Sequence, residues 1–193
     1  MHAIETFYRG IRFRSRLESK WAAFFDEVGW RWQYEPIDFE GWIPDFVLFG
    51  RTEQIFVDVK PIFAPNQEIE AKIDRALGRA RTHSLLEASF NRGEFDFVDP
   101  TARAALILAA CPLEINSRFP GEWIIGWLNA SSTFWEWDEA LFVGPPCGIS
   151  SENHSWGDIL DGRFFGGNEN RRPMNPSPYW ARATNTAQWK PRS

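Results

Sequence analysis

PDFVLFGRTEQIFVDVK, residues 44–60, is the stretch of this 193-residue chain that decides the expected fold. Two apolar runs flank residues 50–53, whose composition is typical of a turn, and this pattern predicts a β-hairpin. If the strands pair symmetrically about that turn, Asp45 lies opposite Asp58, and their Cβ atoms are roughly 5 Å apart. Because side chains alternate between the two faces of a strand, Lys60 shares the face of Asp58. The hairpin therefore brings two acids and one lysine together.

Two carboxylates that face each other repel, so a cation is expected between them. A divalent metal ion meets this need, because Mg²⁺ usually binds one or two carboxylates and completes its octahedron with water and phosphate oxygens. Lys60 would then lie beside a metal-bound water. The alternative is structural: Lys60 neutralises Asp45 and Asp58 at the end of a strand without a metal. These three residues alone leave both interpretations open.

A helix that carries a further acid precedes the hairpin. Apolar residues recur at helical spacing over about residues 16–28, and Gly29 is placed to end the helix. Glu18 falls beside the apolar stripe of this helix. Its alternative role is local, because Ser-x-x-Glu before an apolar run forms a capping box in which Glu18 bonds only to the backbone of Ser15.

Together with the hairpin, this helix resembles the PD-(D/E)xK nuclease superfamily. The matching segments are Arg14-Ser15-Arg16-Leu17-Glu18, Tyr34-Glu35-Pro36, Ile43-Pro44-Asp45-Phe46 and Val57-Asp58-Val59-Lys60-Pro61. They are similar to small nuclease-like proteins of phages and actinobacteria, and to the catalytic part of the transposon endonuclease subunit TnsA. The resemblance implies an α/β fold with a restriction-endonuclease-like core, in which a mixed central β-sheet lies between two helices.

The same resemblance implies hydrolysis of phosphodiester bonds that depends on Mg²⁺ or Mn²⁺. Asp45 and Asp58 would be metal ligands, Glu18 would be a further acid that acts directly or through water, and Lys60 would orient or activate the attacking water. A metal ion lowers the pKa of bound water and stabilises charge on the reacting oxygens, and an ammonium group adds electrostatic stabilisation. Nucleophilic catalysis is not expected, because the three histidines show no arrangement with a Ser or Cys nucleophile.

Length and composition predict one principal domain, because 44% of the residues are apolar and can form a sizeable core. We expect the nuclease-like core at residues 1–115, and a tryptophan-rich β extension at 116–160 that closes the sheet or forms an appended layer. A loop-rich tail at 161–193 can form a short helix over about 179–189. Periodicity leaves residues 104–110 as either a strand or a helix, and the resemblance makes them a strand.

The expected location is the cytoplasm, without a membrane partner. No apolar stretch approaches the roughly 20 residues that span a bilayer, and residues 1–15 lack an apolar signal core. Cys111 and Cys147 are the only cysteines, which fits a reducing compartment. The segment 142–148 resembles a zinc knuckle in which Gly144 replaces the first cysteine. Because structural zinc usually has four thiolate or imidazole ligands, no zinc site is expected.

The formal net charge of −5 is unusual for a protein that binds nucleic acid, because Lys and Arg supply most of the affinity for phosphates. The distribution of charge nevertheless favours such binding. One basic cluster lies at the start of the first helix, beside Glu18, and a second lies on residues 67–86, where periodicity predicts another helix. The cations expected to contact nucleic acid are Arg12, Arg14, Arg16, Lys20, Lys72 and Arg79. The alternative is that they form ordinary solvated helix faces.

The sequence thus predicts a metal-dependent endodeoxyribonuclease that acts on DNA, as a homodimer or within a larger nucleoprotein complex. The alternative is a nuclease-fold module with little or no activity that binds nucleic acid or docks in a phage, defence or mobile-element assembly. The opposed carboxylates favour the enzyme, whereas the acidic net charge and the eleven tryptophans favour the module. Aromatic side chains can stack on exposed bases, but more often they fill a core.

Overall fold

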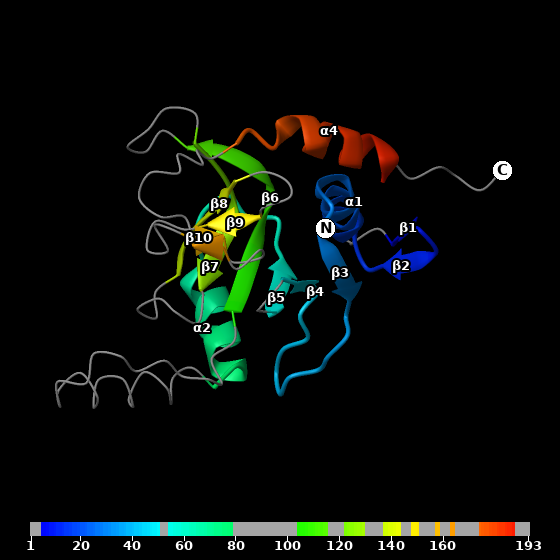
Figure 1. The fold of residues 1–193 in the computed structure, drawn as a ribbon. Coiled ribbons are helices and arrows are strands. Elements are labelled where there is room, and N and C mark those ends of the chain that lie inside the picture. The colour runs from blue at the N-terminus through cyan, green and yellow to red at the C-terminus, as the bar shows by residue number, and fades with distance from the viewer. Residues whose placement is uncertain are drawn as a thin grey trace.

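The computed structural model describes residues 5–50, 54–78, 104–115, 122–129, 137–143, 148–150, 157–158, 163–164 and 174–187. Within these ranges the chain has a mixed α/β fold, in which a curled seven-stranded sheet carries helices on both faces (Figure 1). The helices are α1 (Arg16–Val28), α2 (Gln67–Ala76) and α4 (Ser177–Thr186). The strands are β1 (Thr6–Tyr8), β2 (Ile11–Phe13), β3 (Arg31–Tyr34), β4 (Phe46–Phe49), β5 (Gln54–Val59), β6 (Ala104–Ile115), β7 (Glu122–Asn129), β8 (Asp138–Phe142), β9 (Ile149–Ser150), β10 (Gly157–Asp158) and β11 (Arg163–Phe164).

The main sheet has the strand order β3-β4-β5-β6-β7-β8-β9. All neighbouring strands are antiparallel except β5 and β6, which run parallel. A parallel pair needs a long crossover connection, and the segment between β5 and β6 contains α2. The expected mixed sheet with flanking helices is confirmed.

The register of the predicted hairpin is confirmed. Phe46 of β4 pairs with Val57 of β5, and Phe49 pairs with Gln54. This register continues by one step to Asp45 opposite Asp58. The turn residues 51–53 lie outside the described part of the chain.

The first helix is also confirmed, with the predicted boundaries. Ser15 caps its N-terminus, because the Ser15 hydroxyl accepts a hydrogen bond from the backbone N–H of Glu18 at 3.1 Å. Gly29 ends it in the left-handed conformation at φ 76°, which costs little for a residue without a side chain.

Two apolar cores lie on opposite faces of the sheet. The larger core holds the buried face of α1, including Trp21 and Phe25, together with Ala183 of α4. The smaller core lies under α2, where Ile73 is fully buried. Alternate strand residues serve the two cores, for example Val57 in the larger and Phe56 in the smaller, as period-two strands require.

Helix α4 packs across α1 (Figure 1). The ring of Trp180 lies 4.6 Å from that of Trp21, measured between centroids. At the surface, Arg182 forms an ion pair with Glu27 at 2.7 Å. Trp21 also donates a hydrogen bond to the backbone oxygen of Ala109 in β6 at 2.9 Å. The α1 helix is therefore held between the sheet and a helix that comes late in the sequence.

A small N-terminal hairpin was not predicted. Strands β1 and β2 pair through Tyr8 and Ile11, and the two turn residues Arg9 and Gly10 have φ of 49° and 79°. Positive φ at both central residues is what a two-residue type I′ turn requires. The sequence signal for this hairpin is Gly10 between two short runs with aromatic and aliphatic residues, in a segment that is also rich in arginine.

The tryptophan-rich segment extends the main sheet, since β7 and β8 pair next to β6. Residues 104–110 belong to β6 and are a strand. Trp127 of β7 is buried, as are Trp21, Trp30 and Trp42. The division of the chain at residues 115 and 160 stays a prediction.

Two predicted helices have different boundaries in the structure. The second helix was predicted over residues 67–86. In the structure α2 ends at Ala76 and Gly78 follows at φ 73°, a conformation that ends a helix. Residues 79–86 of the predicted range lie outside the described part of the chain. The late helix begins at Ser177 and ends at Thr186, not over 179–189. Pro178 in its first turn explains the earlier start, because proline is favoured there. No described helix is long and apolar enough to cross a membrane.

Gly126 offers a direct test of this sheet. It lies at the irregular junction of β6, β7 and β8, and a Cβ atom added there would lie 1.9 Å from the backbone oxygen of Ile107. We expect Gly126→Ala to lower the free energy of unfolding by about 1–3 kcal/mol, because the backbones must separate. Ala71→Ser, at an exposed position of α2, should change it by less than about 0.5 kcal/mol. Thermal unfolding followed by circular dichroism measures both, and equal melting temperatures would contradict the close approach of β6 and β7.

Candidate active site

The ends of β4 and β5 place two buried carboxylates next to each other. Asp45 is 3% exposed and Asp58 is 5% exposed. Asp45 accepts a hydrogen bond from the backbone N–H of Val59 through Oδ2 at 2.7 Å. This bond ties the residue before β4 to the end of β5. The position of Asp45 is thus set by the hairpin itself.

Burial and the neighbouring acid change the ionisation of Asp45. Its pKa is raised from 3.8 to about 7, first by burial and then by the negative charge of Asp58. The hydrogen bond from Val59 and the charge of Lys60 oppose this shift, whereas the charge of Glu18 adds to it. The carboxylates of Glu18, Asp45 and Asp58 and the ammonium group of Lys60 therefore lie within electrostatic range of one another.

Lys60 follows β5 directly and binds its neighbour on the same face. Its Nζ lies 2.8 Å from Oδ2 of Asp58, and its side chain is 35% exposed. The backbone N–H of Lys60 donates to the oxygen of Leu108 in β6 at 3.0 Å, so the parallel neighbour holds this residue in place. This ion pair agrees with the alternative in which Lys60 neutralises the acids at the end of the strand without a metal. It also places the ammonium group beside Asp58, a candidate metal ligand.

Glu18 is held at the start of α1 by three donors. Its Oε1 accepts from the Ser15 hydroxyl at 2.7 Å, and its Oε2 accepts from the backbone N–H of Arg14 at 3.0 Å and from the Tyr34 hydroxyl at 2.6 Å. The expected capping box bonded Glu18 to the backbone of Ser15, whereas the structure bonds it to the Ser15 side chain and the preceding N–H. Glu18 is 7% exposed and does more than cap the helix, because it also binds β3.

Tyr34 joins the third strand of the site to the helix. Burial raises the pKa of its hydroxyl, and the hydrogen bond to Glu18 raises it further. Tyr34 therefore stays a neutral donor near pH 7. Its role was missed in the sequence, although it belongs to one of the four matching segments.

Arg14 bridges two acids at the edge of the site. Its Nη2 lies 2.6 Å from Oδ1 of Asp45, and its Nε lies 2.7 Å from Oε1 of Glu35. Glu35 has a positive φ of 41°, and its backbone N–H donates to the backbone oxygen of Asp45 at 3.0 Å. Arg14 was predicted to contact nucleic acid, and Glu35 was given no role. The signal for Glu35 was its place in the segment Tyr34-Glu35-Pro36.

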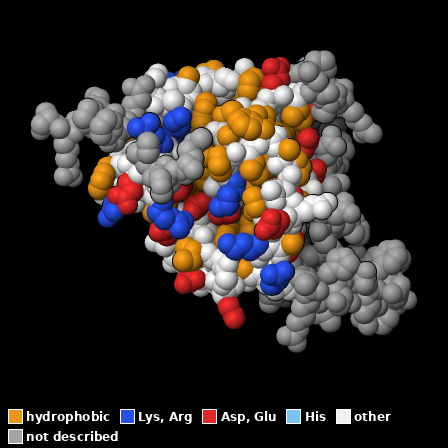
Figure 2. All heavy atoms as spheres, turned by 180° about the vertical axis from the view of Figure 1, so that it is seen from behind, with side chains coloured by type: hydrophobic (Ala, Val, Ile, Leu, Met, Phe, Trp, Pro, Cys, Tyr) orange, Lys and Arg blue, Asp and Glu red, His pale blue; other side chains and the backbone are white. Residues whose placement is uncertain are grey.

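The other predicted nucleic-acid contacts are spread over the surface. Arg12 forms an exposed ion pair with Glu5, and Arg16 is exposed at the start of α1. Lys72 is exposed on α2, which covers the opposite face of the sheet from α1. Arg79 lies outside the described residues. Figure 2 shows one face on which basic and acidic side chains are mixed among apolar ones, so the described part of this face carries no continuous basic surface.

The donor chemistry of the site fits Mg²⁺ or Mn²⁺ only in part. Asp45 and Asp58 supply hard oxygen ligands, and Mg²⁺ usually needs no more than one or two carboxylates from the protein. Across the described ranges, however, no group of three or more His, Cys, Asp or Glu side chains is arranged to hold a metal ion. Both oxygens of Glu18 already accept hydrogen bonds, and this suits a contact through water better than direct ligation.

Comparisons with known proteins identify no family for this chain. No protein-family model, no curated protein and no solved structure matches the chain. Four residues, Glu18, Asp45, Asp58 and Lys60, were expected to meet. Lys60 lies 2.8 Å from Asp58, and the charges of Glu18, Asp58 and Lys60 all act on the pKa of Asp45. That the four form one catalytic site stays a prediction.

The raised pKa of Asp45 predicts a pH-dependent stability. The folded protein keeps the Asp45 proton above pH 3.8, where the unfolded chain releases it. This contribution to stability is complete below that pH, declines as the pH rises, and is lost once the pH exceeds about 7. Asp45→Asn keeps the neutral form, so its free energy of unfolding relative to wild type should rise over this window by on the order of a few kcal/mol. Urea unfolding at a series of pH values measures the difference, and a constant difference would contradict the raised pKa.

The ion pair of Arg14 can be compared with that of Arg12. Arg14→Gln removes the cation from a buried carboxylate, so we expect the free energy of unfolding at pH 8 to fall by about 1–3 kcal/mol, a range kept low by the exposure of half the Arg14 side chain. Arg12→Gln breaks an exposed pair and should leave stability nearly unchanged. Chemical denaturation of both variants tests this order, and equal losses would show that Arg14 does not stabilise Asp45.

Proposed function

We propose that this chain is a metal-dependent endodeoxyribonuclease with a restriction-endonuclease-like core, related to the PD-(D/E)xK nuclease superfamily. The observation that carries the proposal is the register of β4 and β5, which sets Asp45 opposite Asp58 and leaves Lys60 at 2.8 Å from Asp58. Buried acids that face each other destabilise a sheet unless a cation offsets their charge. A bound divalent cation would offset the repulsion between these two acids, whereas folding alone gives no reason for placing them opposite each other.

Each residue then has a distinct role. Asp45 and Asp58 would hold Mg²⁺ or Mn²⁺, and the ion when bound supplies an activated water and stabilises charge on the phosphate. Lys60 lies beside Asp58 and is placed to orient the attacking water and to stabilise negative charge. Asp45 would bind a cation in its ionised form, so metal binding would release the proton that its raised pKa retains.

The surrounding residues position this pair. Glu18 joins α1 to β3 through Tyr34, and the backbone of Arg14 holds Glu18 from the other side. Because Glu18 also contributes to the electrostatic environment of Asp45, it is placed to bind the ion through water. The Arg14 guanidinium lies on Asp45 and is half exposed, so it would be within reach of a phosphate group bound next to Asp45.

A second candidate function is a nuclease-fold module without turnover. The observation that favours it is that both acids already have cationic partners in the protein, Arg14 for Asp45 and Lys60 for Asp58. Such pairs neutralise the acids without a metal. This module would bind nucleic acid or dock in a larger phage, defence or mobile-element complex.

The enzyme, in contrast, would act as a homodimer if it cuts both strands of a duplex.

Cleavage assays separate the two functions. Purified protein is incubated with supercoiled plasmid and with branched DNA, in Mg²⁺, Mn²⁺ or EDTA. The enzyme should nick or linearise DNA only with metal, and Asp58→Asn and Lys60→Met should each lower the rate by at least roughly 100-fold, the order expected when a preorganised electrostatic group is removed. Asp38→Asn, an exposed acid on the loop before β4, is the matched control and should retain the rate.

The opposite outcome is equally specific. If wild type, Asp58→Asn and Lys60→Met bind DNA equally and none cleaves it with either metal, the module is correct and the enzyme is not. Calorimetric titration with Mn²⁺ gives a second measurement that does not depend on turnover. Wild type should bind the ion, and Asp58→Asn should bind it at least roughly 10-fold more weakly, the order expected when a group that supports a metal site is lost.

A further inference from the structure

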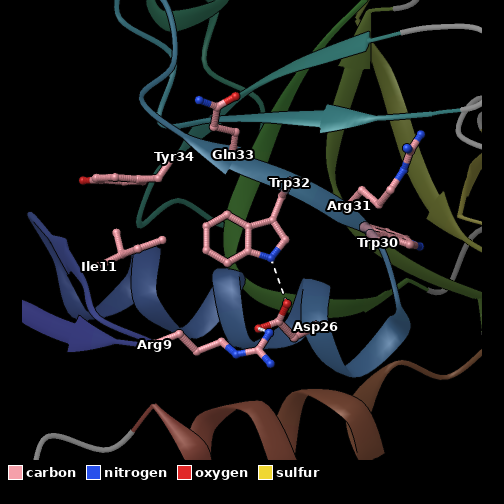
Figure 3. Close-up of a pocket in the computed structure, with 8 residues that line it drawn as sticks. All are labelled: Arg9, Ile11, Asp26, Trp30, Arg31, Trp32, Gln33 and Tyr34. Carbon is pink, nitrogen blue, oxygen red and sulfur yellow. Dashed lines mark hydrogen bonds and ion pairs between the residues drawn. The ribbon is translucent and has the colours of Figure 1, made fainter.

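A pocket of about 630 Å³ lies beside the candidate active site (Figure 3). Its wall is formed by the consecutive residues 30–34, and Arg9, Ile11 and Asp26 complete it. Consecutive residues line a pocket when it runs along the edge of a strand. β3 is the edge strand of the main sheet, and no described strand pairs with its outer side. The pocket is therefore a groove along the open edge of β3.

Aromatic and basic groups dominate this groove. Trp32 and Tyr34 are half-buried, and in Figure 3 both project from β3 on the side of Ile11 and Arg9. Their inner contacts are with core rings, since Phe13 lies 4.5 Å from Tyr34 and 6.2 Å from Trp32, measured between centroids. The core thus fixes both rings, and their remaining surface faces the groove.

The single acid of the groove is already neutralised. The Asp26 carboxylate accepts hydrogen bonds from the Tyr8 hydroxyl at 2.8 Å, from Arg9 at 2.9 Å and from the Trp32 indole at 3.0 Å. Arg31 has a much weaker tie, a 3.4 Å contact with the backbone oxygen of Gly50, and it is exposed. Arg31 lines the pocket but projects from β3 on the side opposite to Trp32 (Figure 3), and among the described residues no carboxylate forms an ion pair with it.

Tyr34 belongs to both the groove and the candidate active site. It lines the groove, and its hydroxyl donates to Glu18. Arg14, whose side chain lies on Asp45, donates its backbone N–H to the same hydroxyl at 3.1 Å. A chain bound along β3 would therefore enter the neighbourhood of the two aspartates at the Tyr34 end.

We propose that this groove binds unpaired nucleotides of single-stranded DNA next to the phosphate that is cut. Bases stack on aromatic side chains, and basic groups follow the backbone. A base inside a duplex is already stacked on both sides, so only an unpaired base can place its face on Trp32. The inference rests on the proposed function and narrows it to DNA with a single-stranded segment, such as a flap, an overhang or a branch.

Binding experiments in EDTA test the groove without cleavage. Fluorescence anisotropy compares a labelled 12-nucleotide strand with a blunt duplex of the same sequence. Wild type should bind the single strand at least several-fold more tightly than the duplex. Arg31→Gln should weaken single-strand binding several-fold and reduce the slope of log K against log salt by about 0.7, the value for one phosphate contact with a single strand. Arg182→Gln, an exposed arginine on α4 outside both basic clusters, is the matched control and should bind as wild type does.

A second probe reports stacking directly. A strand that contains 2-aminopurine should lose fluorescence when it binds wild type, because the base stacks on Trp32, and the loss should be smaller with Trp32→Leu. Circular dichroism establishes whether Trp32→Leu is folded. If Trp32→Leu is unfolded, the binding measurement with Arg31→Gln tests the groove instead. Equal affinity of wild type and Arg31→Gln for the single strand would overturn the proposal.

Other outcomes distinguish rival occupants and functions. Equal affinity for the blunt duplex would overturn single-strand recognition, and displacement of the strand by an equal concentration of polyglutamate would assign the groove to acidic peptides instead. Failure of the nuclease assay with normal single-strand binding would reject the proposed function and leave the groove intact. If wild type and Arg31→Gln cleave plasmid and duplex at the same rate and show no preference for single strands, the groove proposal is rejected and the proposed nuclease function is retained.

Discussion

The need to accommodate a buried carboxylate at the end of β4 is the constraint on which the rest of the site depends. Asp45 has little contact with water, so each of its oxygens must find a donor within the protein. One donor comes from the adjacent strand at Val59, and the other comes from the Arg14 guanidinium just before α1. The hairpin and the entry to the helix are thereby joined through one side chain. Glu18 and Tyr34 strengthen the same connection through a second set of hydrogen bonds.

Local patterns in the sequence were sufficient for the elements that such patterns govern. The symmetric turn gave the correct register for Asp45 and Asp58, and Ser15 and Gly29 marked the limits of α1. β6 was ambiguous, because a short apolar run has the same pattern in a buried strand and in a buried helix. Its pairing with β5 resolves the ambiguity. The β1–β2 hairpin was missed because its turn was read only as part of a basic cluster.

The candidate site was predictable to the same extent. Asp45, Asp58 and Lys60 lie on one hairpin, so strand periodicity alone brings them together. The contacts of Arg14 with Asp45 and of Tyr34 with Glu18 join segments that are 31 and 16 residues apart. No periodicity encodes such contacts, because they depend on how α1 and β3 pack against the hairpin. The groove along β3 was unpredictable for the same reason, since an edge exists only once the strand order is known.

The packing of α4 on α1 has a consequence for how the protein is made. Trp21 and Phe24 contact Trp180, and Glu27 contacts Arg182, across more than 150 positions of sequence. During synthesis the ribosome releases α1 long before α4 exists, so this part of the apolar surface stays open to other proteins until α4 has been synthesised. The helix that carries Glu18 therefore reaches its final environment only after α4 has emerged. Folding of the part that carries Asp45 and Asp58 is therefore coupled in time to the arrival of α4.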